Sequence, residues 1–390
     1  MTKKYTLVSL VALIATLLMS GSVSAQYLPR PDHIIILIEE NQTNATIIGQ
    51  TSSVPYINAL AQDSDAVVFS NFYALEHPSQ PNYLDLFSGN NQGVLDDNVP
   101  GNYPWTTPNM AAELLNKSLT FVTYSQDLPS VGFDGANSTS GSYVRKHNPV
   151  TNWVGTGTNQ VPATLNQPFS AFPTDFSQLP TVCYVVPDQD SDMHNGSAPT
   201  TCTIGDYWMH EHLDSLFHWI RDNNALFIYT FDEDDYFHGN NISLLLYGPM
   251  VKGQVGGATN NVHYTLYSLL RTIEDMYNLG EHAGAAASDS DIVNVWRQPA
   301  PNGINTVAAA KLRVSPNPAN AVVNFDATAL AEVPSAITIT DVTGRVVAVS
   351  AMPVSKKLTL DVADYAPGMY FYHLGQGGSS DPAGKFIVTH

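Results

Sequence analysis

Three pairs of polar residues each follow a dense apolar run, directly or after a short loop, where a buried strand would end: Glu40–Asn41, Asp192–His194 and Asp232–Glu233. In a parallel sheet the carboxyl ends of the strands lie at one edge, so these side chains would meet there. Carboxylates gathered at one edge repel each other unless a cation lies between them. Oxygen ligands with one or two imidazoles suit divalent metals. We therefore expect one or two divalent metal ions, with Mg²⁺, Ca²⁺, Mn²⁺ and Zn²⁺ left open.

Ser79 is the expected nucleophile beside this metal site. It precedes Pro81 and the apolar run 84–87, a pattern typical of the start of a helix. The backbone N–H groups and the dipole of a helix N-terminus favour an anion such as a phosphoryl group. A neighbouring metal ion would also lower the pKa of the hydroxyl. Read alone, Ser79 equally fits an ordinary helix cap.

Lys146 and His147 are the expected proton donors to a leaving group. They stand in the segment 130–175, which is rich in Gly, Ser, Asn, Thr and Pro and has almost no other basic residue. A solvated pair of loop residues is the alternative. Asn82 and His263 are further candidates for contact with substrate or phosphate, although His263 also fits a helix cap.

The elements that must position these residues alternate between strand and helix along the first part of the chain. Apolar runs predict strands at 34–38, 66–70, 119–124, 181–186, 225–231 and 242–247. Helical patterns occur at 54–62, after Ser79, and at 109–117, 206–222 and 265–279. This alternation predicts an α/β domain over 26–297, with a parallel-rich sheet flanked by helices.

The composition changes after residue 297. Residues 298–311 begin with prolines and a glycine and are expected to form a linker. Short alternating runs then follow at close spacing: 322–325, 336–340, 345–349, 358–362, 369–373 and 386–390. They predict a small all-β sandwich over 312–390.

Composition and targeting signals indicate a secreted protein. The formal net charge of −19 argues against nucleic-acid binding through a basic face. Residues 1–25 combine two early lysines, a short apolar run and the small residues 23–25 before a cleavage point, so they are expected to be a signal peptide. We expect no transmembrane helix in the mature chain, because no apolar run is long enough. Outside the cytoplasm Cys183 and Cys202 are expected to form a disulfide, with two buried thiols or metal ligands as alternatives.

Six motifs in order make residues 32–280 resemble the bacterial phosphoesterase family: HIIILIEEN, EHPSQPNYLDLFSG, RKHNPV, VVPDQDSDMHNGS, GDYWMHEHL and TFDEDD. That family includes acid phosphatases and phosphatidylcholine-type phospholipases C, and it is related to the alkaline phosphatase superfamily. The resemblance implies an alkaline-phosphatase-like α/β fold and a metal site formed by Glu40, Asn41, Asp232 and Glu233. It also implies that Ser79 is the nucleophile or a metal ligand, and that Asp192 and His194 lie at the same site.

The chain departs from the phospholipase C pattern after Ser79 and after Glu233. Tyr83 stands where that branch and the sulfatases carry an arginine, and Asp234-Asp235-Tyr236 replaces His-Gly-Gly. Both departures favour the phosphatase-like branch and disfavour a sulfatase.

The C-terminal region has a resemblance of its own. VSPNP at 314–318, ITDVTGR at 339–345, YAPGMY at 365–370 and a terminal KFIV resemble the type A sorting domain of type IX secretion. This resemblance implies a Bacteroidetes-type bacterium, the type IX machinery as a partner, and passage through the periplasm and across the outer membrane to the surface or medium. A carbohydrate-binding or adhesive sandwich is the alternative.

The sequence therefore predicts a secreted, metal-dependent phosphoesterase, acid-phosphatase-like, that hydrolyses phosphate esters through a serine nucleophile. Its partner would be a small phosphoester or a phospholipid. A phospholipase C-type phosphodiesterase and a non-catalytic surface-binding protein on the same fold are the alternatives. The natural substrate, the pH optimum, the oligomeric state and cleavage of the C-terminal domain are left open.

Overall fold

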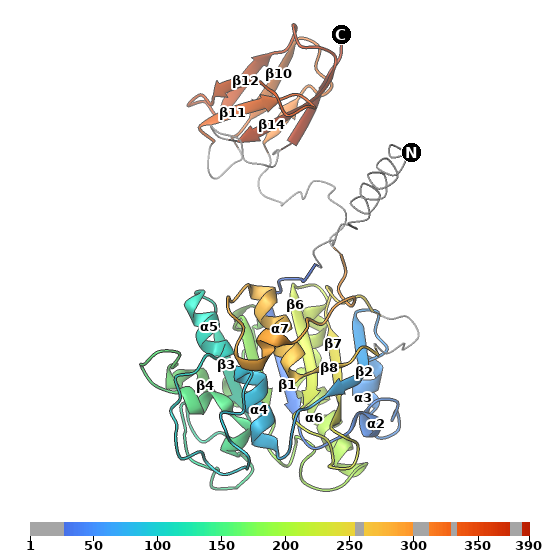
Figure 1. Ribbon diagram of the computed structural model, residues 1–390. Coiled ribbons are helices and arrows are strands. Elements are labelled where there is room, and N and C mark those ends of the chain that lie inside the picture. Colours follow the sequence, from blue (N-terminus) through green and yellow to red (C-terminus); the bar gives the residue numbers. More distant parts are fainter. Residues whose placement is uncertain (1–26, 254–260, 299–311, 329–333, 375–383) are drawn as a thin grey trace, which may run out of the picture. The chain divides into compact units, whose positions relative to one another are not determined.

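The computed structural model describes residues 27–253, 261–298, 312–328, 334–374 and 384–390 (Figure 1). The chain divides into two compact units, Met1–Gln298 and Pro299–His390. The expected signal peptide and nearly all of the expected linker lie outside the described residues, so both stay predictions. No described helix is both long and apolar enough to cross a bilayer.

An eight-stranded sheet lies at the centre of the first unit, in the order β4-β3-β5-β1-β6-β7-β2-β8. Its strands are β1 (His33–Glu39), β2 (Ala66–Tyr73), β3 (Phe121–Ser125), β4 (Asn166–Pro168), β5 (Val182–Val186), β6 (Ala225–Phe231), β7 (Asn241–Tyr247) and β8 (Tyr264–Thr265). All pairings are parallel except those of β7, which runs antiparallel to β6 and to β2. The connection 232–240 is too short for the crossover that parallel neighbours need. The predicted parallel-rich α/β sheet is confirmed.

The apolar composition of the central strand β1 follows from its burial on both faces. Its apolar residues 34–38 are at most 1% exposed, because helices cover both faces of the sheet. In the parallel register Glu39 pairs with Phe231 at the end of β6, and Leu37 pairs with Val185 near the end of β5. The carboxyl ends of β1, β5 and β6 therefore lie together at one edge.

Two groups of helices cover the sheet. They are α2 (Asn44–Ile47), α3 (Pro55–Leu60), α4 (Ser79–Ser88), α5 (Met110–Asn116), α6 (Thr200–Ile220) and α7 (Leu266–Tyr277). Helices α4, α5 and α7 contact one another, whereas α3 contacts α6. In Figure 1, α4 and α7 lie in front of the sheet.

Strand alternation shows which face each group covers. Phe87 of α4 packs on Tyr184 of β5, which shares its register position with Ile36. Phe217 of α6 packs on Phe227 of β6, which shares the neighbouring position with Ile35. Neighbouring positions on a strand point to opposite faces, so α4 and α6 cover opposite faces.

Short 3-10 turns fill the long connections: η1 (Arg145–His147), η2 (Pro149–Trp153), η3 (Ala163–Leu165), η4 (Phe169–Ala171), η5 (Phe176–Gln178) and η6 (Gly284–Ser288). Most of the predicted helices begin and end within a few residues of their predicted bounds. Helix α6 is the exception, because it begins six residues earlier than the predicted 206. The buried residues Thr201 and Cys202 hold this first turn in place despite its weak helix propensity.

The second unit has a three-stranded and a four-stranded antiparallel sheet, β13-β10-β9 and β12-β11-β14-β15. Its strands are β9 (Arg313–Ser315), β10 (Val322–Asp326), β11 (Ala336–Thr340), β12 (Val346–Ala351), β13 (Lys357–Asp361), β14 (Gly368–Leu374) and β15 (Gly384–Val388). Both sheets contribute side chains to one core. The predicted small all-β unit is confirmed.

The predicted Cys183–Cys202 disulfide is wrong, because both residues are free, buried thiols. Cys183 pairs with Ile35 inside the sheet, whereas the Sγ of Cys202 donates to Gln42 Oε1 beyond the strand end. Cys202 thus lies beside Gln42, which follows Glu39, the last residue of β1. Cys183 lies beside Ile35, four residues and about 13 Å before Glu39 along the strand. A disulfide needs Cα atoms within about 7 Å.

Candidate active site

Ser79, the first residue of α4, lies at the centre of the polar cluster at the sheet edge. Its Oγ is 3.1 Å from Glu40 Oε2 and 3.3 Å from Glu233 Oε1, and either carboxylate can accept its proton. Lys146 Nζ donates to the same Oγ at 3.3 Å and to Asp97 Oδ2 at 2.9 Å. A buried hydroxyl therefore lies between two acceptors and a cationic donor.

Backbone hydrogen bonds fix the ends of the strands that carry the carboxylates. The N–H of Glu40 donates to the carbonyl of Asp192 at 2.8 Å, and the N–H of Asp232 donates to the carbonyl of Glu39 at 3.1 Å. Asn41 has a φ of 55°, a left-handed conformation that asparagine tolerates better than most residues. Its N–H donates to Asp232 Oδ1 at 3.3 Å. The turn after β1 thus joins the ends of β1 and β6.

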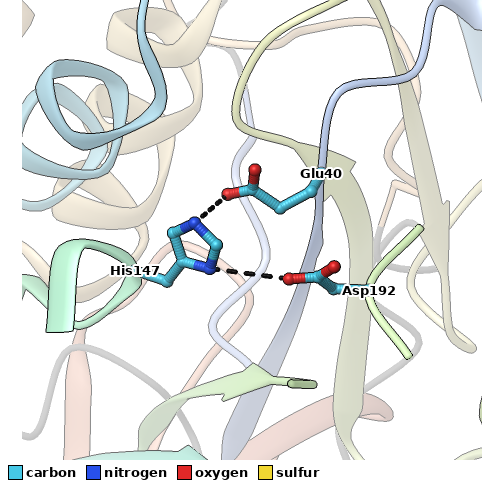
Figure 2. Close-up of side chains that lie close together, drawn as sticks. All are labelled: Glu40, His147 and Asp192. Atoms are coloured by element: carbon cyan, nitrogen blue, oxygen red, sulfur yellow. Dashed lines mark ion pairs between the residues drawn. The ribbon is translucent and has the colours of Figure 1, made fainter. Parts of the chain in front are cut away.

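His147 lies between two carboxylates, as Figure 2 shows. Its Nε2 is 2.5 Å from Glu40 Oε1 and its Nδ1 is 3.5 Å from Asp192 Oδ2. The ring stacks on Tyr83 with centroids 5.0 Å apart, and the side chain is 2% exposed. Donor atoms of Glu40, His147 and Asp192 lie within 4.8 Å of one another, a spacing at which they could hold a metal ion.

The neighbouring charges set the protonation of this group. Burial alone would raise the pKa of Glu40, but His147 and Lys146 outweigh it and lower the pKa to about 2. Burial alone would lower the pKa of His147, yet Glu40 and Asp192 raise it above its usual value. Burial is also the main reason that the pKa of Asp192 rises to about 6. Glu40 is therefore ionised, and His147 and Lys146 stabilise its negative charge.

The remaining carboxylates have too few cationic partners. Burial, followed by repulsion from Glu40, raises the pKa of Asp232 well above its usual value and that of Glu233 to about 8. Within the described residues, the buried Asn41 Oδ1 and Asp232 Oδ2 have no hydrogen-bond donor. Unpaired buried oxygens are costly, and a divalent cation with oxygen ligands would satisfy them. The donor set therefore fits a metal ion.

Of the two predicted substrate ligands, Asn82 is wrong, whereas a substrate contact of His263 stays a prediction. Asn82 is fully buried, and its amide holds the loop before α4: Oδ1 accepts the N–H groups of Leu75 and Glu76, and Nδ2 donates to the carbonyl of Glu76. It has no free atom for a substrate. His263 stacks on Tyr73 beside β8, the edge strand of the sheet. Edge strand β8 is three strand spacings, about 14 Å, from β6.

His194 is at the site edge but remains a prediction as a ligand. Its N–H donates to Asp192 Oδ1 at 2.9 Å, while its ring nitrogen contacts the Asn195 side chain at 3.0 Å. The structure therefore gives His194 a role in holding Asp192, and the ring points to a neighbour in its own loop.

Sequence reasoning missed His77 and Asp97. His77 Nδ1 lies 2.5 Å from Glu233 Oε2, on the far side of that carboxylate from Ser79, and the ring stacks on Tyr236. The position of His77 two residues before Ser79 was a usable signal. Asp97 accepts from Lys146 and from the N–H of Gln80 at 3.0 Å. It stands in a polar loop without periodicity, which carries no signal.

Comparisons with known proteins match both units. The model of the Phosphoesterase family matches residues 51–280, and that of the secretion system C-terminal sorting domain matches residues 313–389. A phosphatidylinositol-3-phosphatase of Mycobacterium tuberculosis is 36% identical over 306 residues, which cover 76% of this chain and 96% of that protein.

More distant relatives include fungal enzymes and solved structures. An acid phosphatase of Aspergillus fumigatus is 29% identical over 225 residues, 55% of this chain and 49% of that protein. The chain thus matches about half the length of that relative. A solved structure of an alkaline phosphatase superfamily protein from Vibrio parahaemolyticus has a TM-score of 0.44 and 11% identity, covering 85% of this chain and 80% of that one.

Proposed function

Because this chain belongs to the Phosphoesterase family, whose members hydrolyse phosphoric esters, we propose that it is a metal-dependent phosphatase with Ser79 as the nucleophile. Its C-terminal unit is a secretion-system sorting domain, so the enzyme acts after export, in the medium or at the cell surface. The observation that carries the proposal is the position of Ser79 Oγ, within 3.3 Å of Glu40, Glu233 and Lys146 at the start of a helix.

Five residues at the sheet edge would hold the metal: Glu40, Asn41, Asp192, Asp232 and Glu233. A bound divalent cation would neutralise their charge and that of a phosphoryl oxygen. His147 is too buried to reach a leaving group, so we assign it the role of holding Glu40 and Asp192 in position. Lys146 alone therefore remains the predicted proton donor to the leaving group.

The reaction then proceeds through groups of this chain. Ser79 gives its proton to Glu40 or Glu233, and its Oγ bonds to phosphorus as the bond from phosphorus to the ester oxygen breaks. Lys146 donates a proton to the departing alkoxide. Carboxylates, Glu40 first among them, more than offset the effect of burial on Lys146 and raise its pKa, so this residue is a cation that can do so. Water then attacks the phosphoserine, releasing phosphate and restoring Ser79.

The test uses the full mature chain and p-nitrophenyl phosphate. Ser79→Ala is expected to lower kcat at least about 1,000-fold, because it removes the nucleophile. Ser88→Ala is the matched control. Ser88 is also buried on α4, but its Oγ donates to the carbonyl of Leu84. A chelator should abolish turnover, and a divalent metal should restore it. Turnover that survives both the Ser79 substitution and the chelator would refute the proposal.

The substrate panel should include phosphatidylinositol 3-phosphate, since the Mycobacterium relative is named for that activity. A choline phospholipid belongs in the same panel. Faster cleavage of the choline lipid than of simple monoesters would favour the phosphodiesterase alternative.

A further inference from the structure

A cavity of about 440 Å³ opens beside the nucleophile. Two of its lining residues connect it with Ser79: Gln80 follows Ser79 in α4, and Lys146 donates to Ser79 Oγ. Attack on phosphorus is roughly in line, so the alcohol leaves on the side away from the serine oxygen. Because Lys146 both contacts Ser79 Oγ and lines the cavity, an alcohol protonated by Lys146 would be released into this space.

Most of the charged atoms around this cavity are paired. Arg145 donates to Asp134 at 2.8 Å and to Asn152 at 2.8 Å. Lys146 pairs with Asp97 at 2.9 Å. Arg145 Nη2, in contrast, is buried and has no hydrogen-bond partner among the described residues, so the pairing of charges does not decide whether the ligand is charged.

Three lining amides have hydrogen-bonding capacity to spare. The side chains of Asn98, Asn137 and Gln189 make no hydrogen bond to another described residue, and all three line the cavity. Gln80 differs, because its Nε2 donates to the carbonyls of Asp96 and Asn98 at 2.8 Å. A side-chain amide both donates and accepts, which matches the hydroxyl group of an alcohol.

We infer that this cavity is a leaving-group site for a polyhydroxylated alcohol, such as a sugar or polyol, with Asn98, Asn137 and Gln189 as specificity residues. The inference rests on the proposed phosphatase activity, and it adds the class of alcohol and the residues that select it. The amides without a protein partner favour a leaving group that carries hydroxyl groups over a purely apolar one. The volume is within the range of small-molecule pockets.

A matched pair of substrates tests the inference on the full mature chain. Glucitol 6-phosphate and n-hexyl phosphate both present a six-carbon primary phosphate ester, but only the first carries hydroxyl groups. We expect the native enzyme to prefer glucitol 6-phosphate in kcat/KM by about tenfold or more, because several hydrogen bonds form with the hydroxyls. The preference should appear mainly in KM.

In the variant Asn137→Ala/Gln189→Ala, the kcat/KM preference for glucitol 6-phosphate over n-hexyl phosphate should fall about tenfold, because two amides are removed. Gln178→Ala is the control, because Gln178 is an exposed amide outside the cavity, and it should keep the native preference. Thermal unfolding of each variant confirms that it is folded.

The outcomes separate this inference from the proposed function. Native enzyme that hydrolyses p-nitrophenyl phosphate but shows no preference for glucitol 6-phosphate would overturn the leaving-group site alone. A preference that survives the double substitution would also overturn it, because the named residues would not be its source. Absence of hydrolysis on every phosphate ester would overturn the phosphatase proposal, and the leaving-group site with it.

Discussion

Glu113 of α5 and Glu274 of α7 form a buried carboxyl pair far from the nucleophile, and this pair predicts how stability changes with pH. Glu274 is 1% exposed, and its Oε1 accepts the N–H of Ala283 at 2.9 Å. Burial raises the pKa of Glu274 to about 9 and that of Glu113 to about 7. The ordinary value, which the unfolded chain would have, is 4.5.

The sign follows from proton binding. Between pH 4.5 and the raised values, the folded protein holds protons that the unfolded chain has released. Stability is therefore complete below pH 4.5 and falls as the pH rises toward 7 and then 9. Each extra proton costs about 1.4 kcal/mol per pH unit. From about pH 5.5 to 7.5, Glu274 alone should remove about 3 kcal/mol from the free energy of unfolding.

Glu274→Gln should remove this dependence, because glutamine cannot ionise. Urea unfolding at about pH 5.5 and 7.5 measures it, and tryptophan fluorescence reports on the first unit alone, since all five tryptophans lie before residue 299. The difference in unfolding free energy between native protein and variant should change by about 3 kcal/mol between the two pH values. Glu211→Gln, an exposed acid on α6, is the control and should leave the native dependence. Parallel curves for the native protein and Glu274→Gln would refute the reasoning.

Three further predictions concern the site and the thiols. Glu40→Gln should weaken divalent-cation binding, measured by calorimetry, about tenfold or more, whereas Glu39→Gln, the same change on the opposite face, should keep it; equal loss would contradict the assignment. Lys146→Gln should lower kcat roughly 100-fold on alkyl phosphates but less on p-nitrophenyl phosphate, whose leaving group needs no proton; equal effects would argue against Lys146 as the acid. Cys183 and Cys202 should both react with a thiol reagent after unfolding without reductant, and a single disulfide recovered by mass spectrometry would contradict the structure.

The strands and the site edge could be predicted from sequence because their signal is local. Runs of β-branched residues mark strands that are buried on both faces, and the polar residues that follow must lie at the sheet edge. Residues far apart in sequence, such as Glu40, Ser79 and Glu233, are brought together in this way. Lys146 was predicted from composition, as a cation in a segment almost without other basic residues.

What could not be predicted depends on register and on side-chain direction. The distance between Cys183 and Cys202 follows from where β5 and α6 align, which no local pattern encodes. Asn82 lies in the first turn of α4, close to Ser79, yet its side chain hydrogen-bonds to the loop that precedes the helix. The antiparallel direction of β7 depends on the length of one connection, and Asp97 enters the site from a loop without periodicity.

The two adjacent glutamates at the end of β1 show that position, more than residue type, defines the site. Both are fully buried, and they lie on opposite faces of the sheet. Glu40 faces His147 and Lys146, which lower its pKa to about 2, so that it is an anion. Glu39 faces the α6 side, where its carboxyl oxygens have no hydrogen-bond partner among the described residues, and burial raises its pKa well above the usual value. Because Glu39 points to the face opposite His147 and Lys146, this strand end presents one carboxylate to the metal site and one acid to the other face of the sheet.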